Sequence, residues 1–273
     1  MGLPAPFERL IRLHEKLPPP APSDWLANHQ ESGQTFREYV RNQPVKADRK
    51  RRIIYVQPLG PFTPTQRKIV DLTAEYLQIY FDLPVKIQKD LPLDLIPASA
   101  RRKHPRWGMD QILSTYVLDK VLYPRLPDDA VASIAFTASD LWPGEGWNFV
   151  FGQASLSNRV GVWSIYRKGD PDLSDDAFRL CLVRTLKTAT HETGHMFSMQ
   201  HCIFYECNMC GSNHLEESDR HPLWLCPQCL AKLCFATKAD PRKRYQRLAA
   251  FCKDHGLKQE QEFYQRSLKA IGE

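Results

Sequence analysis

The string HETGHMFSMQH, residues 191–201, constrains the fold of this chain more than any other feature. On an α-helix, residues four apart project from one face about one turn apart, so His191 and His195 can approach one ion. This spacing is typical of a zinc site, in which Glu192 would reach a water bound to the metal. Zinc lowers the pKa of that water, and the carboxylate takes its proton as it attacks a carbonyl. We predict His191 and His195 as zinc ligands and Glu192 as the catalytic residue.

The residues before the motif predict the helix that carries it, over Asp172–Met199. Apolar side chains recur there at spacings of three or four, which indicates one buried face; they are Phe178, Cys181, Leu182, Leu186 and Ala189. Ser174 can cap the first turn of this helix. A helix that ends near Ser198 and turns back would bring His201 to the same ion. Three histidines and one water make a tetrahedral catalytic site with an open position.

Upstream of this helix, strand-like and helix-like segments alternate, which predicts an α/β sheet that is partly parallel, with a hairpin at one edge. The predicted strands are Arg52–Gln57, Pro84–Gln88 and Ala130–Thr137, followed by hairpin arms over Trp147–Ala154 and Val160–Tyr166 around Ser157-Asn158-Arg159. Thr65–Phe81 and Asp110–Leu122 have helical periodicity. Residues 241–273 are expected to be helical and amphipathic.

The first 50 residues contain seven prolines, among them Pro18, Pro19 and Pro20, which favour an extended spacer. A short amphipathic helix is expected before them; its apolar residues are Phe7, Leu10, Ile11 and Leu13. We predict an N-terminal proline-rich extension over 1–50, a catalytic domain over 51–201 and a C-terminal subdomain over 202–273.

Six of the eight cysteines lie between Cys202 and Cys234. No secretory signal precedes them, because the N-terminus MGLPAPFERLIRLHEK is charged where a signal peptide needs an apolar core. Clustered cysteines in such a chain indicate metal binding before disulfides. By spacing alone, the pairs Cys207-x-x-Cys210 and Cys226-x-x-Cys229, separated by 15 residues, form a zinc-site pattern.

The histidine motif resembles the metzincin signature H-E-x-x-H-x-x-G-x-x-H with its later methionine turn, although Ser198 stands where the family has glycine. The string H-C-x-x-x-x-C-x-M, then Gly211-Ser212, then C-P-x-C, resembles the archaemetzincins in particular. The resemblance is strongest over residues 185–235. It implies a metzincin-like zincin domain with a mixed sheet and a long active-site helix, followed by a cysteine-rich, zinc-binding and helical C-terminal part.

The resemblance also implies two zinc ions per chain, one catalytic and one structural. The implied ligands are His191, His195 and His201 for the catalytic zinc, and Cys202, Cys207, Cys226 and Cys229 for the structural zinc. Met209 would form the methionine turn. Cys210 remains an alternative to Cys202, since spacing alone favours it.

These features predict a zinc metallopeptidase acting on a peptide or protein, and the resemblance extends to aminopeptidase-like cleavage of short peptides. The alternative is a non-catalytic zinc-binding interaction module. Metzincin-like clefts bind an extended peptide along an edge strand, for which Trp147–Ala154 is the candidate.

We expect neither nucleic-acid nor membrane partners, and a cytoplasmic location. The net charge is +6, but its clusters at Lys46–Arg52 and Arg101–Lys103 lack interleaved stacking aromatics. No apolar run approaches the roughly 18 residues that a membrane span requires.

Overall fold

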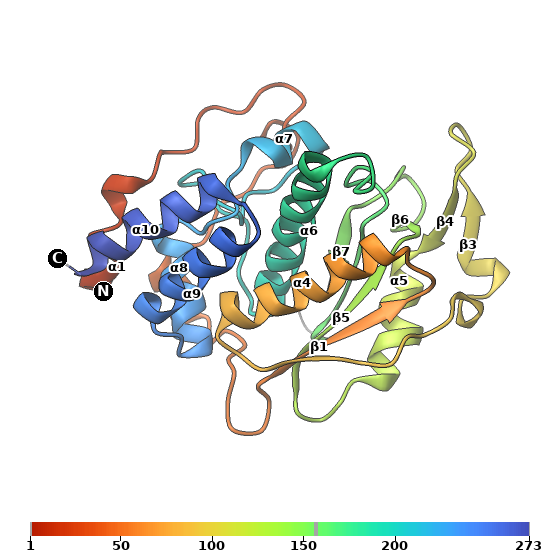
Figure 1. Ribbon diagram of the computed structural model, residues 1–273, viewed down its shortest axis with the longest axis horizontal. Coiled ribbons are helices and arrows are strands. Elements are labelled where there is room, and N and C mark those ends of the chain that lie inside the picture. Colours follow the sequence, from red (N-terminus) through yellow and green to blue (C-terminus); the bar gives the residue numbers. More distant parts are fainter. Residues whose placement is uncertain (1, 156–157, 273) are drawn as a thin grey trace. The chain divides into compact units, whose positions relative to one another are not determined.

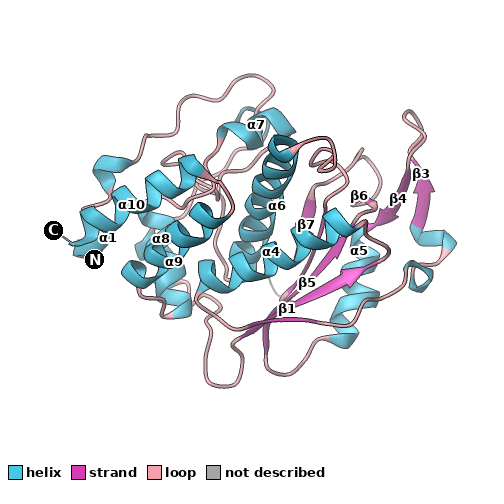
Figure 2. Cartoon of the chain, in the orientation of Figure 1, coloured by secondary structure: helices cyan, strands magenta, loops and turns pink. Residues whose placement is uncertain are grey.

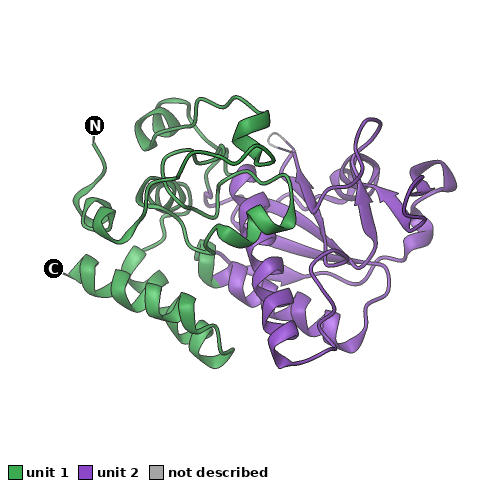
Figure 3. Ribbon diagram, turned by 90° about the horizontal axis from the view of Figure 1, so that it is seen from above, with its two compact units in different colours: residues 1–46, 79–82, 197–273 green, residues 47–78, 83–196 purple. Residues whose placement is uncertain are grey.

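The structure, a computed structural model, describes residues 2–155 and 158–272 (Figure 1, Figure 2). These residues form two compact units, coloured separately in Figure 3. The first unit comprises Met1–Lys46, Ile79–Asp82 and Phe197–Glu273, and the second comprises Ala47–Gln78 and Leu83–Met196. The main sheet belongs to the second unit, and the cysteine cluster belongs to the first.

The second unit contains a five-stranded sheet with the order β2-β1-β5-β8-β7. Its strands are β1 (Ile53–Leu59), β2 (Val85–Ile87), β5 (Ala130–Thr137), β7 (Gly152–Ala154) and β8 (Val160–Ser164). All neighbours are parallel except β7, which pairs antiparallel with β8 at the edge. This confirms the predicted mixed sheet with a hairpin at one edge. Ser157, in the predicted hairpin turn, lies outside the described residues.

A smaller sheet in the same unit corrects one prediction. Its strands are β3 (Arg101–Lys103), β4 (Asp110–Leu113) and β6 (Asp140–Trp142). The helix predicted over Asp110–Leu122 is wrong for its first four residues, which form β4: Gln111–Leu113 pair with β6, and Asp110 pairs with Lys103 of β3. The buried bond from Gln111 Nε2 to Asp140 Oδ2, at 2.8 Å, holds this pairing. Helical structure starts only with α5 (Ser114–Tyr116) and continues as a π-helical segment over Val117–Leu122.

Helix α6 (Asp175–Met196) packs against β5, β7 and β8. Gly161 on β8 faces this helix, because a Cβ built there would lie 2.7 Å from Met196 Cε. Side chains alternate along a strand, so Val160 and Val162 point to the opposite face. There they join a buried apolar cluster with the helical segment Val117–Leu122. β8 is therefore covered on both faces, as expected for a strand inside an α/β sheet.

Helix α4 (Pro64–Phe81) begins one residue before the predicted Thr65 and ends where predicted. The predicted helical segment at the C-terminal end is two helices, α9 (Pro241–Asp254) and α10 (Lys258–Gly272), which pack against each other. Among the described residues, no helix has both the length and the apolar character needed to cross a bilayer.

The first unit joins the two ends of the sequence. Its remaining helices are α1 (Ala5–Glu8), α2 (Trp25–Asn28), α3 (Phe36–Arg41), α7 (Leu215–Arg220) and α8 (Pro227–Thr237). Both α1 and α3 contact α8, and Phe7 and Leu10 of the predicted amphipathic segment are buried. The N-terminal residues therefore fold together with the cysteine-rich segment.

Candidate metal centres

Helix α6 begins at the predicted cap and presents its motif near its end. Ser174 Oγ accepts a hydrogen bond from the Ala177 N–H at 3.1 Å, which satisfies a free donor of the first turn. The helix ends at Met196, and Ser198 has φ 63°, the left-handed conformation that ends a helix. Glycine would adopt this conformation with less strain. For Ser198 the left-handed conformation costs roughly 1 kcal/mol.

The two helix histidines converge on one point. The Nε2 atoms of His191 and His195 are 3.0 Å apart, and their rings lie edge to face with centroids 4.6 Å apart. Two nitrogens bound to one tetrahedral zinc at about 2.0–2.1 Å would be about 3.4 Å apart. Both side chains are half-buried, and Thr190 and Thr193 of the same helix are buried. The pair therefore fits a metal ion, with little movement of either ring.

Glu192 lies between the two histidines in sequence and faces the edge strand. A Cβ built on Gly152 of β7 would lie 3.1 Å from Glu192 Cγ and 3.2 Å from Thr188 Cγ2. The absence of a side chain at this position lets the strand pass close to the glutamate. Sequence reasoning missed this role of Gly152, although a glycine inside a strand is itself a signal of close approach.

His201 lies in the first unit, outside the unit that contains α6. Its Nδ1 is 2.8 Å from Oε1 of Glu31, and its ring meets Trp25 edge to face with centroids 5.2 Å apart. Both contacts come from the proline-rich extension, for which sequence reasoning predicted no part in the site. No sequence motif marks Glu31, because the contact joins residues 170 positions apart.

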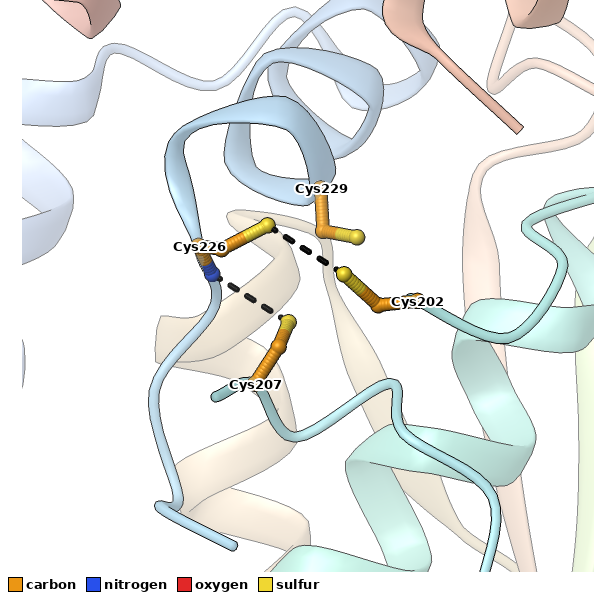
Figure 4. Close-up of side chains that lie close together, drawn as sticks. All are labelled: Cys202, Cys207, Cys226 and Cys229. Carbon is orange, nitrogen blue, oxygen red and sulfur yellow. Dashed lines mark hydrogen bonds between the residues drawn. The ribbon is translucent and has the colours of Figure 1, made fainter. Parts of the chain in front are cut away.

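Four cysteines gather in the first unit, as Figure 4 shows. Cys202 and Cys207 come from the segment after α6, and Cys226 and Cys229 come from the start of α8 (Figure 4). Their sulfur atoms lie within 4.8 Å of one another, and those of Cys202 and Cys226 are 3.6 Å apart. Thiolates about 2.3 Å from one tetrahedral zinc are about 3.8 Å apart, so the group fits that ion.

Hydrogen bonds and the helix dipole favour negative charge at particular atoms of this cluster, while burial raises the pKa values of Cys207 and Cys226 well above the usual range. The Cys207 sulfur accepts the N–H of Cys226 at 3.2 Å and that of Met209 at 3.5 Å. Cys226 occupies the N-cap position of α8, without a side-chain capping bond, and Cys229 lies in the first turn, where the helix dipole stabilises anions. Hydrogen bonds from the neighbouring thiols hold the pKa of Cys202 well below its usual range.

Cys210 stands beside this group and outside it. Its Sγ donates to the Tyr205 carbonyl at 3.4 Å, and the group that fits a metal contains Cys202 instead. Met209 is buried, and its carbonyl accepts the Cys202 N–H at 2.8 Å. Burial raises the pKa of Cys181 to about 11, as expected for a packed, unreactive thiol.

A third cluster contains residue types that can bind a metal, but hydrogen bonds within the protein explain its geometry. Its residues are Asp24, His214 and Glu217. His214 Nδ1 accepts the Glu217 N–H at 3.2 Å, so Nε2 carries the ring proton. That protonated nitrogen faces Asp24 Oδ1 at 3.5 Å. The two Glu217 oxygens accept the N–H groups of Trp25 and Asn213. The cluster is therefore a helix cap with hydrogen-bonded carboxylates, and we assign no metal to it.

The chain matches one known protein family over most of its length. A family model described as peptidase family M54 matches residues 52–234. Archaemetzincin-2 of Pongo abelii and archaemetzincin-2 of Homo sapiens are each 34% identical to the chain over 265 residues. These alignments cover 86% of this chain and 73% of each relative.

Solved structures agree with this match. The archaemetzincin of Methanopyrus kandleri superposes with a TM-score of 0.54 at 29% identity, covering 70% of this chain and 98% of that chain. The archaemetzincin of Archaeoglobus fulgidus gives a TM-score of 0.52 at 28% identity, covering 66% of this chain and 99% of that chain.

Proposed function

The chain belongs to peptidase family M54, the archaemetzincins, and from this premise we propose that it cleaves peptide bonds with Glu192 as the general base. Membership in the family makes it a zinc metallopeptidase. The proposal adds the ligand set His191, His195 and His201, the role of Glu192, and a second, structural zinc. The observation that carries it is the convergence of the His191 and His195 Nε2 atoms, 3.0 Å apart on one rigid helix.

In this proposal, Glu192 carries out the proton transfers of the reaction. A zinc ion bound at the histidines would polarise the scissile carbonyl and lower the pKa of a coordinated water. Glu192, next to the first ligand, would accept a proton from the attacking water and return it to the leaving nitrogen. The buried residues of α6 hold the carboxylate in place, because the helix is packed against three strands.

We infer that His201 completes the ligand set. Only five residues separate it from His195, and the left-handed turn at Ser198 reverses the chain between them. The turn is well supported, because Ser198 Oγ accepts the Val45 N–H at 3.1 Å. We propose Met209 as the methionine of the turn that gives metzincins their name, on the strength of its position after the motif.

The substrate would add to the sheet as a further strand along β7. β7 is the last strand of the sheet order, and its Gly152 lies next to Glu192. A peptide hydrogen-bonded to such an edge would use main-chain groups, which gives affinity without strict sequence preference. Aminopeptidase-like trimming is the finer form of this proposal, and peptides with free and acetylated N-termini would separate it from internal cleavage.

The second zinc would be held by Cys202, Cys207, Cys226 and Cys229. Four thiolates make a closed site, which stabilises a fold and leaves no position for substrate. The site would tie the segment after His201 to α8, since two ligands come from each.

The test is Glu192→Gln assayed on a panel of quenched peptides, with zinc counted by native mass spectrometry. We expect two zinc ions per chain and a fall in kcat of about 10²- to 10⁴-fold, the usual contribution of a general base. Glu75→Gln, an exposed glutamate of α4, is the matched control and should keep full activity. Undiminished turnover in Glu192→Gln would sink the mechanism, and no cleavage by the unmodified chain would favour a binding module.

A further inference from the structure

We propose that Glu31 is a positioning residue that holds His201 in the tautomer and orientation a zinc ion needs. The inference rests on the proposed function, because it takes His201 as a ligand. It assigns a part in the metal centre to the N-terminal extension. Residue 31 precedes the range 52–234 that the family model matches, so the family match itself does not assign this role.

The geometry fixes where the His201 proton lies. Glu31 Oε1 is 2.8 Å from His201 Nδ1 and accepts the indole N–H of Trp25 at 2.9 Å. An ionised carboxylate only accepts hydrogen bonds, so Nδ1 must be the protonated nitrogen. Nε2 then keeps its lone pair, which is the form of the ring that binds a metal. Side chains of His201 and Glu31 are 17% and 25% exposed, so water screens the contact only in part.

Trp25 keeps Glu31 in place. Its backbone N–H donates to Glu217 Oε1 at 2.9 Å, and its ring stacks on His29 with centroids 3.8 Å apart. Gly211 makes room for the indole, because a Cβ there would lie 2.5 Å from Trp25 Cδ1. An exposed carboxylate on a loose segment would lose much of its effect to side-chain motion, and these contacts prevent that.

The N-terminal segment that contains Glu31 also binds residues 198–200, which lead to His201. The side chain of Gln34 donates to the Ser198 carbonyl at 3.3 Å and accepts the Gln200 N–H at 3.3 Å. Gln34 is buried, so both bonds are shielded from water. Residues 31 and 34 therefore fix the direction of the turn and the ring at its end.

Carboxylates behind histidine ligands raise the basicity of the ring and fix its orientation, and their loss weakens metal binding by about 10- to 100-fold. We expect Glu31→Ala to bind the zinc of the histidine site about 10- to 100-fold more weakly, measured by competition with a chelator of known affinity. Glu31→Gln keeps an acceptor oxygen without the charge, so its affinity should fall between those of Glu31→Ala and the unmodified chain. A role in packing alone would leave the isosteric Glu31→Gln at full affinity, so an intermediate affinity is specific to the charge of the carboxylate.

The zinc of the cysteine site is the internal standard, and its retention shows that each variant is folded. Glu15→Ala, an exposed glutamate of the same extension, is the matched control and should bind both ions normally. Unchanged affinity at the histidine site in either Glu31 variant would overturn the inference. His201→Ala, measured in parallel, separates the two proposals: full affinity there would mean that the ligand set itself is wrong.

Discussion

Gly152 of the edge strand and Glu192 of α6 are so close that a Cβ built on the glycine would lie 3.1 Å from the glutamate Cγ. Trp163 Cβ, on the neighbouring strand, would lie at the same distance. A methyl group therefore fits on this face of β7 only if a neighbouring side chain gives way by a few tenths of an ångström. We predict that Gly152→Ala shifts Glu192 by a few tenths of an ångström and lowers kcat by up to about 10-fold, less than the roughly 100-fold effect of a 1 Å misplacement.

The measurement is kcat on a quenched peptide, together with the zinc content of the variant. Zinc should be retained, because the substitution touches neither helix histidine. Ala154→Gly, two residues along the same strand, removes a methyl group instead of adding one and should leave kcat near normal. Full activity in Gly152→Ala would show that Glu192 has room to move.

Gly211 has the corresponding relationship with Trp25. The Cβ of an alanine there would lie 2.5 Å from Trp25 Cδ1 and 2.7 Å from Nε1. We predict that Gly211→Ala lowers the free energy of unfolding by about 1–3 kcal/mol, the usual range for overpacking, because the indole must leave its position. Urea unfolding followed by tryptophan fluorescence measures both the stability and the displacement. Ser212→Ala is the neighbouring control; equal stabilities of the two variants would contradict the prediction.

Local sequence patterns predicted α4, β5 and α6 well, because each has a clear apolar period and α6 has the cap at Ser174. They failed over Asp110–Leu113, where apolar residues at helical spacing form a strand held by β6. Tertiary pairing decides such short segments, and a local period cannot report it.

The residues that we propose as metal ligands could be selected from the sequence, because zinc chemistry demands fixed residue types at fixed spacing. The residues that contact and orient the proposed site residues could not be selected in this way. Gly152 approaches Glu192 through sheet packing, and Glu31 reaches His201 across most of the sequence. The glycine at position 152 is a local signal of close approach but does not name its partner, and the contact of Glu31 leaves no local pattern, so only the folded chain shows both pairs.

Single removal of Cys202 and Cys210 tests the cysteine site. Both thiols donate to the Tyr205 carbonyl, but only Cys202 is one of the four residues whose sulfur atoms lie within 4.8 Å of one another. We predict that Cys202→Ala loses one zinc ion per chain and Cys210→Ala keeps two, counted by native mass spectrometry. Cys210→Ala is thus the matched control. If Cys202→Ala keeps two ions and Cys210→Ala loses one, the spacing pattern of C-x-x-C pairs identifies the ligands after all.

Loss of the cysteine-site zinc should also unfold its surroundings. Structural zinc binding is coupled to folding, and an empty site would leave buried thiols without their partner. We expect Cys202→Ala to expose the start of α8 to hydrogen exchange while α6 of the other unit stays protected. Unchanged exchange at α8 would mean that the zinc is dispensable for this part of the fold.

The lowered pKa of Asp24 leads us to predict that the stability of the N-terminal extension depends on pH. Burial opposes its ionisation, but the Ala21 N–H at 2.9 Å and the Arg220 guanidinium at 2.6 Å outweigh that effect and lower the pKa of Asp24. A carboxyl whose pKa is lower in the folded state stabilises the fold above its unfolded pKa of about 3.9, and loses that contribution as the pH falls through the folded pKa. Asp24→Asn should therefore be less stable than the unmodified chain at pH 7, and the difference in stability should narrow as the pH falls from about 4 through the folded pKa.

Urea unfolding of Asp24→Asn and of the unmodified chain at pH 7 and pH 3 tests this prediction. Acid affects the zinc sites of both proteins equally, so the difference between their free energies of unfolding removes that effect. Asp71→Asn, an exposed residue of α4, should show little difference from the unmodified chain at pH 7. A gap between Asp24→Asn and the unmodified chain that is equally large at both pH values would mean that Asn fails for its shape. A gap that closes with acid would show that the charge of Asp24, held by Arg220 and the Ala21 N–H, fastens the extension to α7.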